Sequence, residues 1–265
     1  MNGSGARFDS PLEGRSFRHI ENVIYLAATS STNDVAKAIV EKMLAESEDV
    51  RPTIIVADTQ SAGHGRLGRS WVSLPGSLAV SVIVPWPAGP ERVHLPLRAG
   101  IALARGLSRA FGLDVRLKWP NDLLVNRKKL GGILVEARAN DEGEGWAIVG
   151  VGLNVKGTRQ EMDARDLRDA TSLEEAGAPA GMLEGVRPLS SLLDILDVPL
   201  AEPETEPLPE AFASVAAHAP GDALSVQNEG RTVSGVFRGV NADGALRLGL
   251  ERGEETVLSG DVVLF

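Results

Sequence analysis

The sequence predicts an α+β fold in which helices pack on a β-sheet and a small β-barrel follows at the C-terminal end. Over the first two thirds of the chain, short β-branched runs typical of buried strands alternate with stretches of helical periodicity. After an acidic, Pro-rich stretch, short strands divided by Gly- and Asp-bearing turns fall within about 45 residues. The length of 265 residues exceeds one ordinary domain. We therefore expect a polar lead-in, a main domain, an acidic Pro-rich connector and a C-terminal domain, at residues 1–22, 23–196, 197–218 and 219–265.

The first element is a strand at Val23–Ala27, which runs into the polar segment Thr29–Asp34. Behind that segment, apolar residues recur at helical spacing through Leu44, so a helix is expected there. The hydroxyl and amide side chains of the polar segment are expected to cap its N-terminus. The free N–H groups could also receive an anion or a polar ligand.

Strands and helices continue through the main domain. The expected helix Leu95–Phe111 has Pro96 in its first turn, where a missing N–H does no harm. The capping-box spacing in Thr171–Glu175 predicts another helix, and a hairpin turn is expected at Asn126–Lys128. Further strands are expected at Thr53–Ala57, Leu78–Val84, Val115–Trp119, Leu123–Val125, Ile133–Ala137 and Ala147–Val151.

The C-terminal third begins with a change of composition. From Asp197 to Glu210 the chain has four prolines and five acidic residues with hardly any periodicity, which predicts a mobile connector. A barrel of the size that follows is too small to be more than an appended module. Its strands are expected at Ala223–Gln227, Thr232–Arg238, Ala245–Leu250 and Glu255–Leu258.

Charge and composition exclude several classes of protein. Lys and Arg number 27 against 36 Asp and Glu, a net charge of −9, which disfavours a protein that coats nucleic acid. The absence of cysteine excludes disulfides, thiolate metal sites and a cysteine nucleophile. The histidines have no metal-like spacing. No apolar run approaches a membrane span, and Met1–Arg18 has no signal-peptide character, so a soluble, cytoplasmic protein is expected.

The segment Gly63–Trp71 contains glycines spaced as G-x-G-x-x-G. A dinucleotide-binding fold would need a helix at once, but Pro75-Gly76 and a β-rich segment follow. The loop does offer Arg66 and Arg69, whose planar forks suit carboxylate or phosphate oxygens, and an indole on which a nucleobase could stack. Taken alone, the loop is interpreted in preference as a surface hairpin with solvated arginines, and both interpretations stay open at this point.

A second group of charges lies between Arg116 and Lys129, where five residues are cationic. Positive charge gathered in a chain of net charge −9 indicates a small anionic ligand, although the three cations ending at Lys129 could form a solvated turn. Asp122 could hold Mg²⁺ or cap the turn after Pro120. The glycines of Gly150–Asn154 mark either a bulge or a close approach by another group.

Five stretches, in this order, resemble the successive signatures of biotin protein ligases: Ser31-Thr32-Asn33, Gly63–Trp71, Lys118–Asp122, Lys129–Glu136 and Gly150–Asn154. The segment Ser259–Val262 resembles the small C-terminal module of that family. The resemblance implies a mixed β-sheet catalytic domain with helices packed on it, like that of class II synthetases, and an SH3-like C-terminal barrel.

The resemblance also implies an enzyme that uses ATP and Mg²⁺ to convert biotin to biotinyl-5′-AMP. The biotinyl group would then pass to one lysine of the biotin carboxyl-carrier protein of an acyl-CoA carboxylase. Cations must bring the carboxylate and the triphosphate together, because these two anions repel each other.

The residues that match the family's motifs take the following roles by resemblance. The implied catalytic residues are Lys129, Arg66 and Lys118. The implied biotin-binding residues are Ser31, Thr32, Asn33, Gln60, Gly63, Arg66, Lys129 and Gly132. The implied ATP-binding residues are Arg66, Arg69, Trp71, Asn121, Lys129 and Asn154, with Asp122 as the candidate Mg²⁺ ligand.

Two features depart from the family pattern. His64 stands where the family usually has arginine, which makes one contact of the loop weaker or titratable. About 23 residues precede the first expected catalytic strand, too few for a DNA-binding domain, so no repressor activity, no DNA partner and no membrane partner are expected. A homodimer stays open. The rival functions are a lipoate or octanoyl ligase-type acyl transferase and a non-catalytic biotin sensor.

Overall fold

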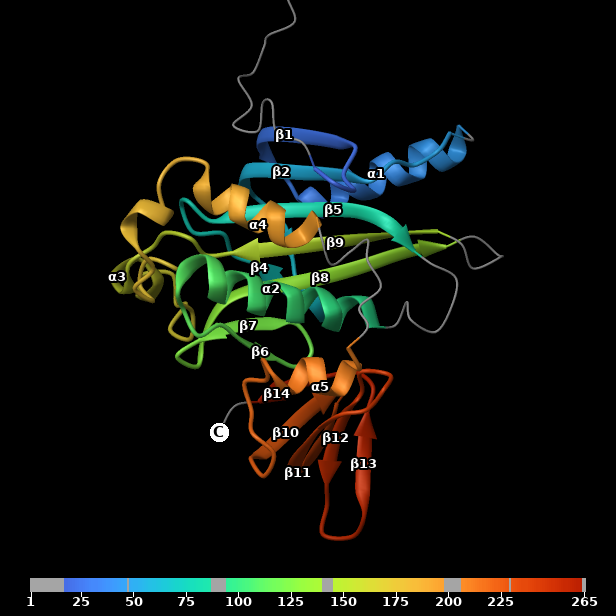
Figure 1. Ribbon diagram of the computed structural model, residues 1–265, viewed down its shortest axis with the longest axis vertical. Helices are drawn as coiled ribbons and strands as arrows, with labels where there is room; N and C mark the ends of the chain where they lie inside the picture. The colour runs from blue at the N-terminus through green and yellow to red at the C-terminus, as the bar shows by residue number, and fades with distance from the viewer. Residues whose placement is uncertain are drawn as a thin grey trace, which may run out of the picture.

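The computed structural model of the chain describes residues 17–46, 48–86, 94–139, 145–197, 206–228 and 230–263. Within these ranges a seven-stranded sheet forms the larger part of the molecule and a five-stranded sheet forms the C-terminal part (Figure 1). The large sheet has the order β1-β2-β5-β9-β8-β7-β6. It is mixed, because β1 and β2 are parallel while the other neighbouring strands are antiparallel. The predicted α+β class with a mixed sheet is confirmed.

The elements of the main domain follow the predicted order. Its sheet comprises β1 Asn22–Thr29, β2 Thr53–Gln60, β5 Leu78–Trp86, β6 Arg116–Lys118, β7 Asp122–Val125, β8 Lys128–Ala139 and β9 Gly145–Leu153. Its helices are α1 Thr32–Ala45, α2 Leu95–Phe111, α3 Arg159–Asp163, η3 Ala180–Met182 and α4 Arg187–Asp197. Between β2 and β5 lie β3 Gly63–His64, η1 Arg66–Gly68 and β4 Ser70–Trp71, and we call residues 63–71 the glycine–arginine loop.

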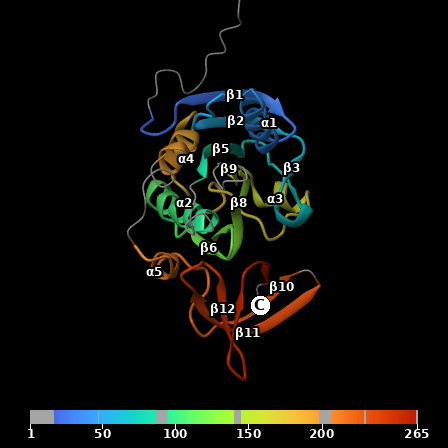
Figure 2. The same cartoon turned by 90° about the vertical axis from the view of Figure 1, so that its right-hand side faces the viewer.

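Alternation along the strands gives the large sheet two different faces. Val80 and Val82 of β5 pack into the core that contains the apolar residues of α2 and α4. Ile83, the next residue of β5, packs with Val40 of α1 on the opposite face. This follows from the geometry of a strand, in which successive side chains point to opposite faces. Figure 2 shows the result, with α2 and α4 on one side of the sheet and α1 and α3 on the other.

Of two local predictions for the main domain, the structure confirms the hairpin turn and contradicts the helix. Asn126 and Arg127 both have positive φ and join β7 to β8, as a two-residue hairpin requires. The helix predicted at Thr171–Glu175 is wrong, since the chain there makes a single turn. Gly177 takes a φ of +90° and Pro179 follows, and neither continues a helix.

The C-terminal domain is a five-stranded antiparallel sheet of order β13-β12-β11-β10-β14. Four of its strands were predicted, whereas β14 was missed because three residues carry almost no periodicity. Its end strands β13 and β14 are not paired with each other in the described residues. The strands are β10 Ala223–Asn228, β11 Arg231–Val240, β12 Leu246–Gly249, β13 Glu254–Val257 and β14 Asp261–Val263.

The predicted connector, residues 197–218, contains a helix. This helix, α5 Leu208–Ala213, buries Leu208, Ala211 and Phe212, so this part of the range is packed, and residues 198–205 lie outside the described residues. The domain boundaries themselves stay a prediction.

Backbone and side-chain contacts fix the C-terminal domain and its helix to β6. The Leu117 N–H donates to the Val215 carbonyl at 2.7 Å, and the Ala217 N–H donates to the Leu117 carbonyl at 2.9 Å. Trp119, buried beside β6, donates from Nε1 to the Gly244 carbonyl at 2.9 Å. The strand β6, with which the cationic segment Arg116–Lys129 begins, is therefore held directly against the C-terminal domain. Among the described residues, no helix combines the length and the apolar character needed to cross a membrane.

Candidate active site

A row of small residues on the α1 face of the large sheet forms the floor of a cavity. Ala79 of β5 pairs with Gly152 of β9, which pairs with Gly132 of β8. In the neighbouring row, Ser81 of β5 pairs with Gly150 of β9. Cross-strand partners project from the same face of a sheet, so five small residues on three adjacent strands leave a hollow where larger side chains would fill the space.

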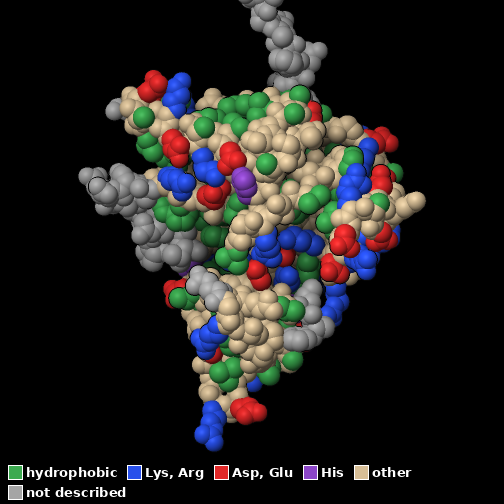
Figure 3. All heavy atoms as spheres, turned by 180° about the vertical axis from the view of Figure 1, so that it is seen from behind, with side chains coloured by type: hydrophobic (Ala, Val, Ile, Leu, Met, Phe, Trp, Pro, Cys, Tyr) green, Lys and Arg blue, Asp and Glu red, His purple; other side chains and the backbone are tan. Residues whose placement is uncertain are grey.

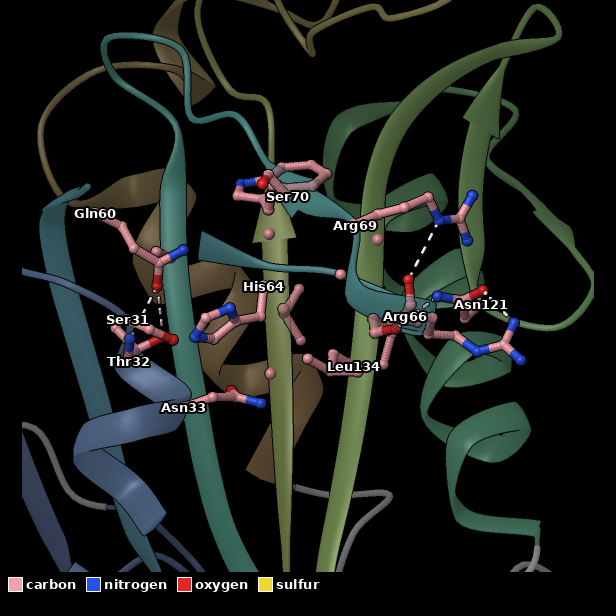
Figure 4. A pocket seen from close by; sticks show the side chains of 18 of the residues that line it. Ser31, Thr32, Asn33, Gln60, His64, Arg66, Arg69, Ser70, Asn121 and Leu134 are labelled. Carbon is pink, nitrogen blue, oxygen red and sulfur yellow. Dashed lines mark hydrogen bonds between the residues drawn. The ribbon is translucent and has the colours of Figure 1, made fainter. Parts of the chain in front are cut away.

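The walls of this cavity come from the N-terminus of α1, the end of β2, the glycine–arginine loop, the turn before β7, and β8. Figure 4 shows residues from α1 and β2 on one side, with Arg66, Arg69 and Asn121 on the other. Most residues implied by the resemblance line it: Ser31, Thr32, Asn33, Gln60, Arg66, Arg69, Trp71, Asn121, Asp122, Lys129 and Gly132. Three of the implied residues, Lys118, Gly63 and Asn154, are outside this lining.

The N-terminus of α1 forms the polar end of the cavity. Gln60 Oε1 accepts a hydrogen bond from the Thr32 N–H at 2.9 Å and lies 3.2 Å from the Thr32 hydroxyl. Ser31, the N-cap residue, makes no side-chain cap bond, so the cap comes from β2 and not from the polar segment as predicted. Ser81 donates to Asn33 Oδ1 at 2.6 Å. Thr32, Asn33 and Ser81 are buried, and together with Gln60 they present donors and acceptors in fixed directions.

The opposite end of the cavity is cationic and centres on Asp122. Its Oδ1 lies 2.6 Å from Lys129 Nζ, and its Oδ2 lies 3.3 Å from Lys118 Nζ. Burial opposes ionisation of this carboxyl, but the charges of the two lysines outweigh it, so the pKa of Asp122 is lowered below its ordinary value. The ionised carboxylate holds the Lys129 ammonium at the cavity wall, 6.0 Å from the centre of the Trp71 ring.

The pairing of Asp122 with two lysines limits what it can contribute as the predicted Mg²⁺ ligand. Both of its oxygens already face a lysine, and the described residues contain no group of three or more His, Cys, Asp or Glu that could hold a metal ion. Mg²⁺ prefers six oxygen ligands and usually keeps several waters. The protein therefore offers an auxiliary carboxylate here and no cage of its own, so phosphate oxygens and water would supply most ligands.

The two arginines of the glycine–arginine loop meet the C-terminal domain. Arg66 Nη1 donates to Asn121 Oδ1 at 3.3 Å and to the Gly260 carbonyl at 3.2 Å. Asp261 Oδ1 lies 2.8 Å from Arg69 Nη2 and 3.6 Å from Arg66 Nη1. Burial lowers the pKa of Arg66, and the Asp261 charge opposes that shift. Seen from behind, Lys and Arg side chains gather in the hollow above the C-terminal domain, with acidic side chains beside them (Figure 3).

Lys118 faces the same junction and not the cavity. Its ammonium donates to the Val262 carbonyl at 3.2 Å in addition to its pairing with Asp122. The neighbouring Gly260 has a φ of +140°, and a Cβ there would lie 2.7 Å from Val226 Cγ1, so the turn that brings β14 to the site requires glycine. Lys118 is thus placed to hold β14 against Asp122, and its predicted catalytic role has no contact with the cavity to support it.

The glycines of β9 mark close approaches and not a bulge. A Cβ at Gly152 would lie 2.4 Å from Trp71 Cε2, and one at Gly150 would lie 2.2 Å from Asn33 Oδ1. The pairing of β9 with both neighbouring strands is continuous through these positions. Glycine therefore lets the indole lie on the sheet inside the cavity, where its Nε1 is buried without a hydrogen-bond partner among the described residues.

Asn154 and Gly63 have structural contacts instead of a place in the lining. Asn154 is buried, accepts from Ser77 Oγ at 3.3 Å and donates to the Thr171 carbonyl at 3.0 Å. Both ends of its amide are therefore used to join two loops, and we leave it out of the nucleotide contacts. A Cβ at Gly63 would lie 2.3 Å from Gln60 Nε2, so this glycine makes room for a side chain that does line the cavity.

Sequence reasoning missed a second set of charged residues beside the cavity. Asp34 and Lys37 are ion-paired at 2.9 Å on α1, and their spacing of three along a predicted helix is a signal that could have found them. Glu136 of β8 and Asp261 of β14 join the site only through the tertiary structure. Both lie in segments that resemble the family, Lys129–Glu136 and Ser259–Val262, but nothing in those segments assigned either acid a place at the site.

Comparisons with known proteins agree with this geometry. The chain matches the biotin/lipoate A/B protein ligase family over residues 25–154 and the biotin protein ligase C terminal domain over residues 225–264. It is 31% identical over 255 residues to a bifunctional ligase/repressor of Bacillus subtilis, covering 92% of this chain and 74% of that protein. It is also 31% identical over 261 residues to a biotin–acetyl-CoA-carboxylase ligase of Mycobacterium tuberculosis, covering 94% of this chain and 90% of that protein.

The same family appears among solved structures. The biotin protein ligase of Aquifex aeolicus, solved in complex with biotin and ATP, is similar with a TM-score of 0.69 and 25% sequence identity, covering 92% of this chain and 98% of that chain. Both the main domain and the C-terminal domain thus have their counterparts in one group of enzymes. The chain belongs to the biotin protein ligase family.

Proposed function

We propose that this enzyme activates biotin with ATP as biotinyl-5′-AMP and then transfers the biotinyl group to a lysine of a carboxylase carrier domain. The observation that carries the proposal is that Arg66, Trp71 and Lys129 line one cavity, although they lie on the glycine–arginine loop and on β8. A ligand in this cavity meets two cations and an aromatic face at once. That combination suits a carboxylate and a nucleoside phosphate brought together.

The polar end of the cavity favours biotin over an acyl chain. Ser31, Thr32 and Asn33 are buried there beside Gln60, and a cyclic urea offers donors and acceptors to such groups. The dithiolane ring of lipoate or the methyl end of octanoate offers neither, so the hydrogen-bonding capacity that these groups do not use among themselves would stay unpaired. Leaving buried polar groups unpaired is costly and discriminates strongly between ligands. We therefore place the urea head of biotin at this end and its carboxylate toward Lys129.

In the first step a biotin carboxylate oxygen attacks the α-phosphorus, and the bond from that phosphorus to the bridging oxygen breaks as pyrophosphate leaves. No proton moves. The transition state brings the negative charges of the carboxylate and the phosphates close together. The Lys129 ammonium and the Arg66 guanidinium are fixed positive charges that stabilise this transition state. Asp122 would offer its carboxylate to Mg²⁺, which when bound with the nucleotide would neutralise further phosphate charge. Arg69, more exposed at the rim, is placed to meet the outer phosphates.

In the second step the neutral amine of the carrier lysine attacks the acyl carbon, and AMP leaves with the anhydride oxygen. The new amide nitrogen loses its proton to solvent. Until the carrier arrives, the mixed anhydride must be kept from water. The glycine–arginine loop contributes Arg66 and Trp71 to the cavity, so its position over the site would control that exposure.

Incubation with labelled biotin, ATP and a carrier domain tests the proposal. Label on one carrier lysine, identified by mass spectrometry, supports it. Tight biotin binding with no AMP formed would instead indicate the non-catalytic sensor.

The nearest enzymatic rival is tested by ATP–pyrophosphate exchange with biotin and lipoate offered separately. Exchange with biotin alone is expected. Exchange with lipoate alone would reassign the substrate while keeping the acyl-adenylate chemistry.

A further inference from the structure

The glycine–arginine loop has little packing of its own. β3 and β4 pair through two residues each, and none of the residues of η1 is buried. Leu67 has a φ of 54° and a side chain that is 62% exposed, so it adds no core contact. The shape of the loop therefore depends on side-chain contacts to other elements. Asp261 holds Arg69 on one side, and His64 reaches toward α1 on the other.

A chain of polar contacts begins at His64. Its Nε2 lies 2.9 Å from Oδ2 of Asp34 in the first turn of α1. The other carboxylate oxygen of Asp34 lies 2.9 Å from Lys37 Nζ, which lies 3.2 Å from Oε1 of Glu136 on β8. Asn33 Nδ2 donates to the other oxygen of Glu136 at 2.8 Å. The loop is thus joined, contact by contact, to a residue at the polar end of the cavity.

The charges along this chain alternate. Burial opposes ionisation of Asp34, but its hydrogen bonds with Lys37 and His64 outweigh burial and lower its pKa. The hydrogen bond with Asp34 raises the pKa of Lys37, so this ammonium stays charged. The groups around the imidazole are the carboxylate of Asp34, then Lys37 on the same helix, Glu136 on β8, and the two arginines of the loop itself. A protonated imidazole bonds to a carboxylate more strongly than a neutral one.

We propose that the contact between His64 and Asp34 is a latch that fastens the glycine–arginine loop to α1 over the bound ligand, and that both are positioning residues. The latch joins the wall that carries Arg66 and Trp71 to the wall that holds the urea head. Opening it lets the loop move away and the ligand leave. The identity of that ligand, biotin, rests on the proposed function, whereas the contact between loop and helix does not.

Limited digestion with trypsin tests the latch in the free protein, through cleavage after Arg66 and Arg69 followed by mass spectrometry. Asp34→Asn and His64→Asn should each be cut about fivefold faster than the unaltered protein, the size expected for a partly exposed ion pair. His64→Arg keeps a cation opposite Asp34 and should be cut after Arg66 and Arg69 at the original rate, with cleavage at the new site after residue 64 counted separately. Glu41→Gln is the matched control, because it makes the same acid-to-amide change on α1 and its carboxylate faces Arg138 at 4.0 Å, not the loop.

The rate at which biotin dissociates gives the second readout. Asp34→Asn and His64→Asn should each release biotin about fivefold faster than the unaltered protein. His64→Arg keeps a cation opposite Asp34 and should release biotin at the original rate. A residue with a merely structural role would not tolerate arginine and lose its effect with asparagine at the same position.

The cleavage and dissociation experiments together distinguish a failure of the latch from a failure of the proposed function. Cleavage and dissociation that are the same in Asp34→Asn and Glu41→Gln would overturn the latch. Faster cleavage of Asp34→Asn in a protein that binds no biotin would uphold the contact and overturn the proposed ligand. If Asp34→Asn fails to fold in a thermal unfolding check, both experiments are done with His64→Asn. The His64 side chain is 46% exposed, so its replacement should not disturb folding.

Discussion

At the scale of single residues, Lys129 depends on Asp122 for its place in the cavity. The ion pair of 2.6 Å holds a flexible ammonium against the wall, and Lys118 occupies the other oxygen of the same carboxylate. One acid, with a side chain only 14% exposed, thus fixes two cations in different directions, one toward the cavity and one toward the C-terminal domain. This is why two lysines of one cationic segment have different surroundings.

Lys129→Ala should abolish adenylation while leaving the fold intact. Removing one fixed charge from a transition state typically lowers the rate by about 100-fold to 1,000-fold, measured here by ATP–pyrophosphate exchange. Lys128→Ala is the matched control, because its ammonium faces Glu175 at 3.5 Å outside the cavity. Wild-type-like exchange by Lys129→Ala would refute its proposed role.

Gly152→Ala should impair ATP use through Trp71. The added methyl would lie 2.4 Å from the indole, so the ring must leave its seat on the sheet. We expect the KM for ATP to rise by about tenfold, the loss of roughly one stacking contact. Gly181→Ala, where the nearest atom within 4 Å is a flexible Arg187 nitrogen at 3.5 Å, is the control. An unchanged KM in Gly152→Ala would remove Trp71 from the nucleotide site.

At the scale of elements, the cavity exists because three strands with small side chains on one face lie under a loop with large side chains. β5, β8 and β9 place small residues on the α1 face and larger apolar residues on the face covered by α2. The glycine–arginine loop crosses the small-residue face, and its Trp71 fills part of the hollow. Away from the cavity, the His218 ring meets the ring of Phe237 on β11 edge to face, with the two centroids 6.1 Å apart.

The stability of the C-terminal domain should depend on pH through His218. Burial lowers the pKa of His218 below its usual value, with smaller effects from Asp222 in the opposite direction. The unfolded chain, with an ordinary histidine pKa near 6.5, therefore binds more protons in the window between the two values. The free energy of unfolding should fall as pH drops below about 6.5 and level off below the folded pKa.

Urea unfolding at pH 7.5 and pH 5.5 checks this dependence. His218→Asn removes the titrating group, so the difference between the two pH values should shrink relative to the unaltered protein. The other three histidines are present in both proteins and cancel in the comparison. Equal pH differences in the two proteins would contradict the expectation.

At the scale of the whole molecule, the C-terminal domain holds the cationic residues of the site from outside the cavity lining. Its segment around β14 contacts three cations of the main domain: Arg66 through the Gly260 carbonyl, Arg69 through Asp261, and Lys118 through the Val262 carbonyl. The prediction of an appended module rested on the small size of this domain, and it gave the domain no role. The contacts of β14 suit a role in holding the cations of the site.

Asp261→Asn should loosen the loop on the side opposite to His64. The guanidinium groups of Arg66 and Arg69 lose their shared carboxylate, and we expect a rise of about threefold to fivefold in the KM for ATP, as for other partly exposed ion pairs. Asp261→Glu should restore part of the loss. Glu251→Gln changes an exposed acid of the same domain and should have no effect. A KM for ATP that falls in Asp261→Asn would mean that this carboxylate competes with the phosphates.

The comparison of prediction and structure follows these three scales. Helices α1 and α2 and most strands were predicted because their signals are local, namely apolar period, β-branched runs and proline or glycine punctuation. The helix at Thr171–Glu175 was wrong because a capping signal cannot outweigh Gly177 and Pro179 in the following turn. The cap of α1 was predicted from the wrong residues, because the N–H of Thr32 donates to Gln60, which lies at the end of β2 and outside the polar segment.

The sequence by itself determined the order of the elements, the cationic segments and the small residues of β9, because each is written in neighbouring or periodic positions. Only the tertiary structure decided that Lys129 faces the cavity while Lys118 faces β14, and that Asp34 and Asp261 meet the two ends of one loop. These pairings join residues tens to hundreds of positions apart. Their geometry follows from strand register and domain packing, which no local pattern encodes.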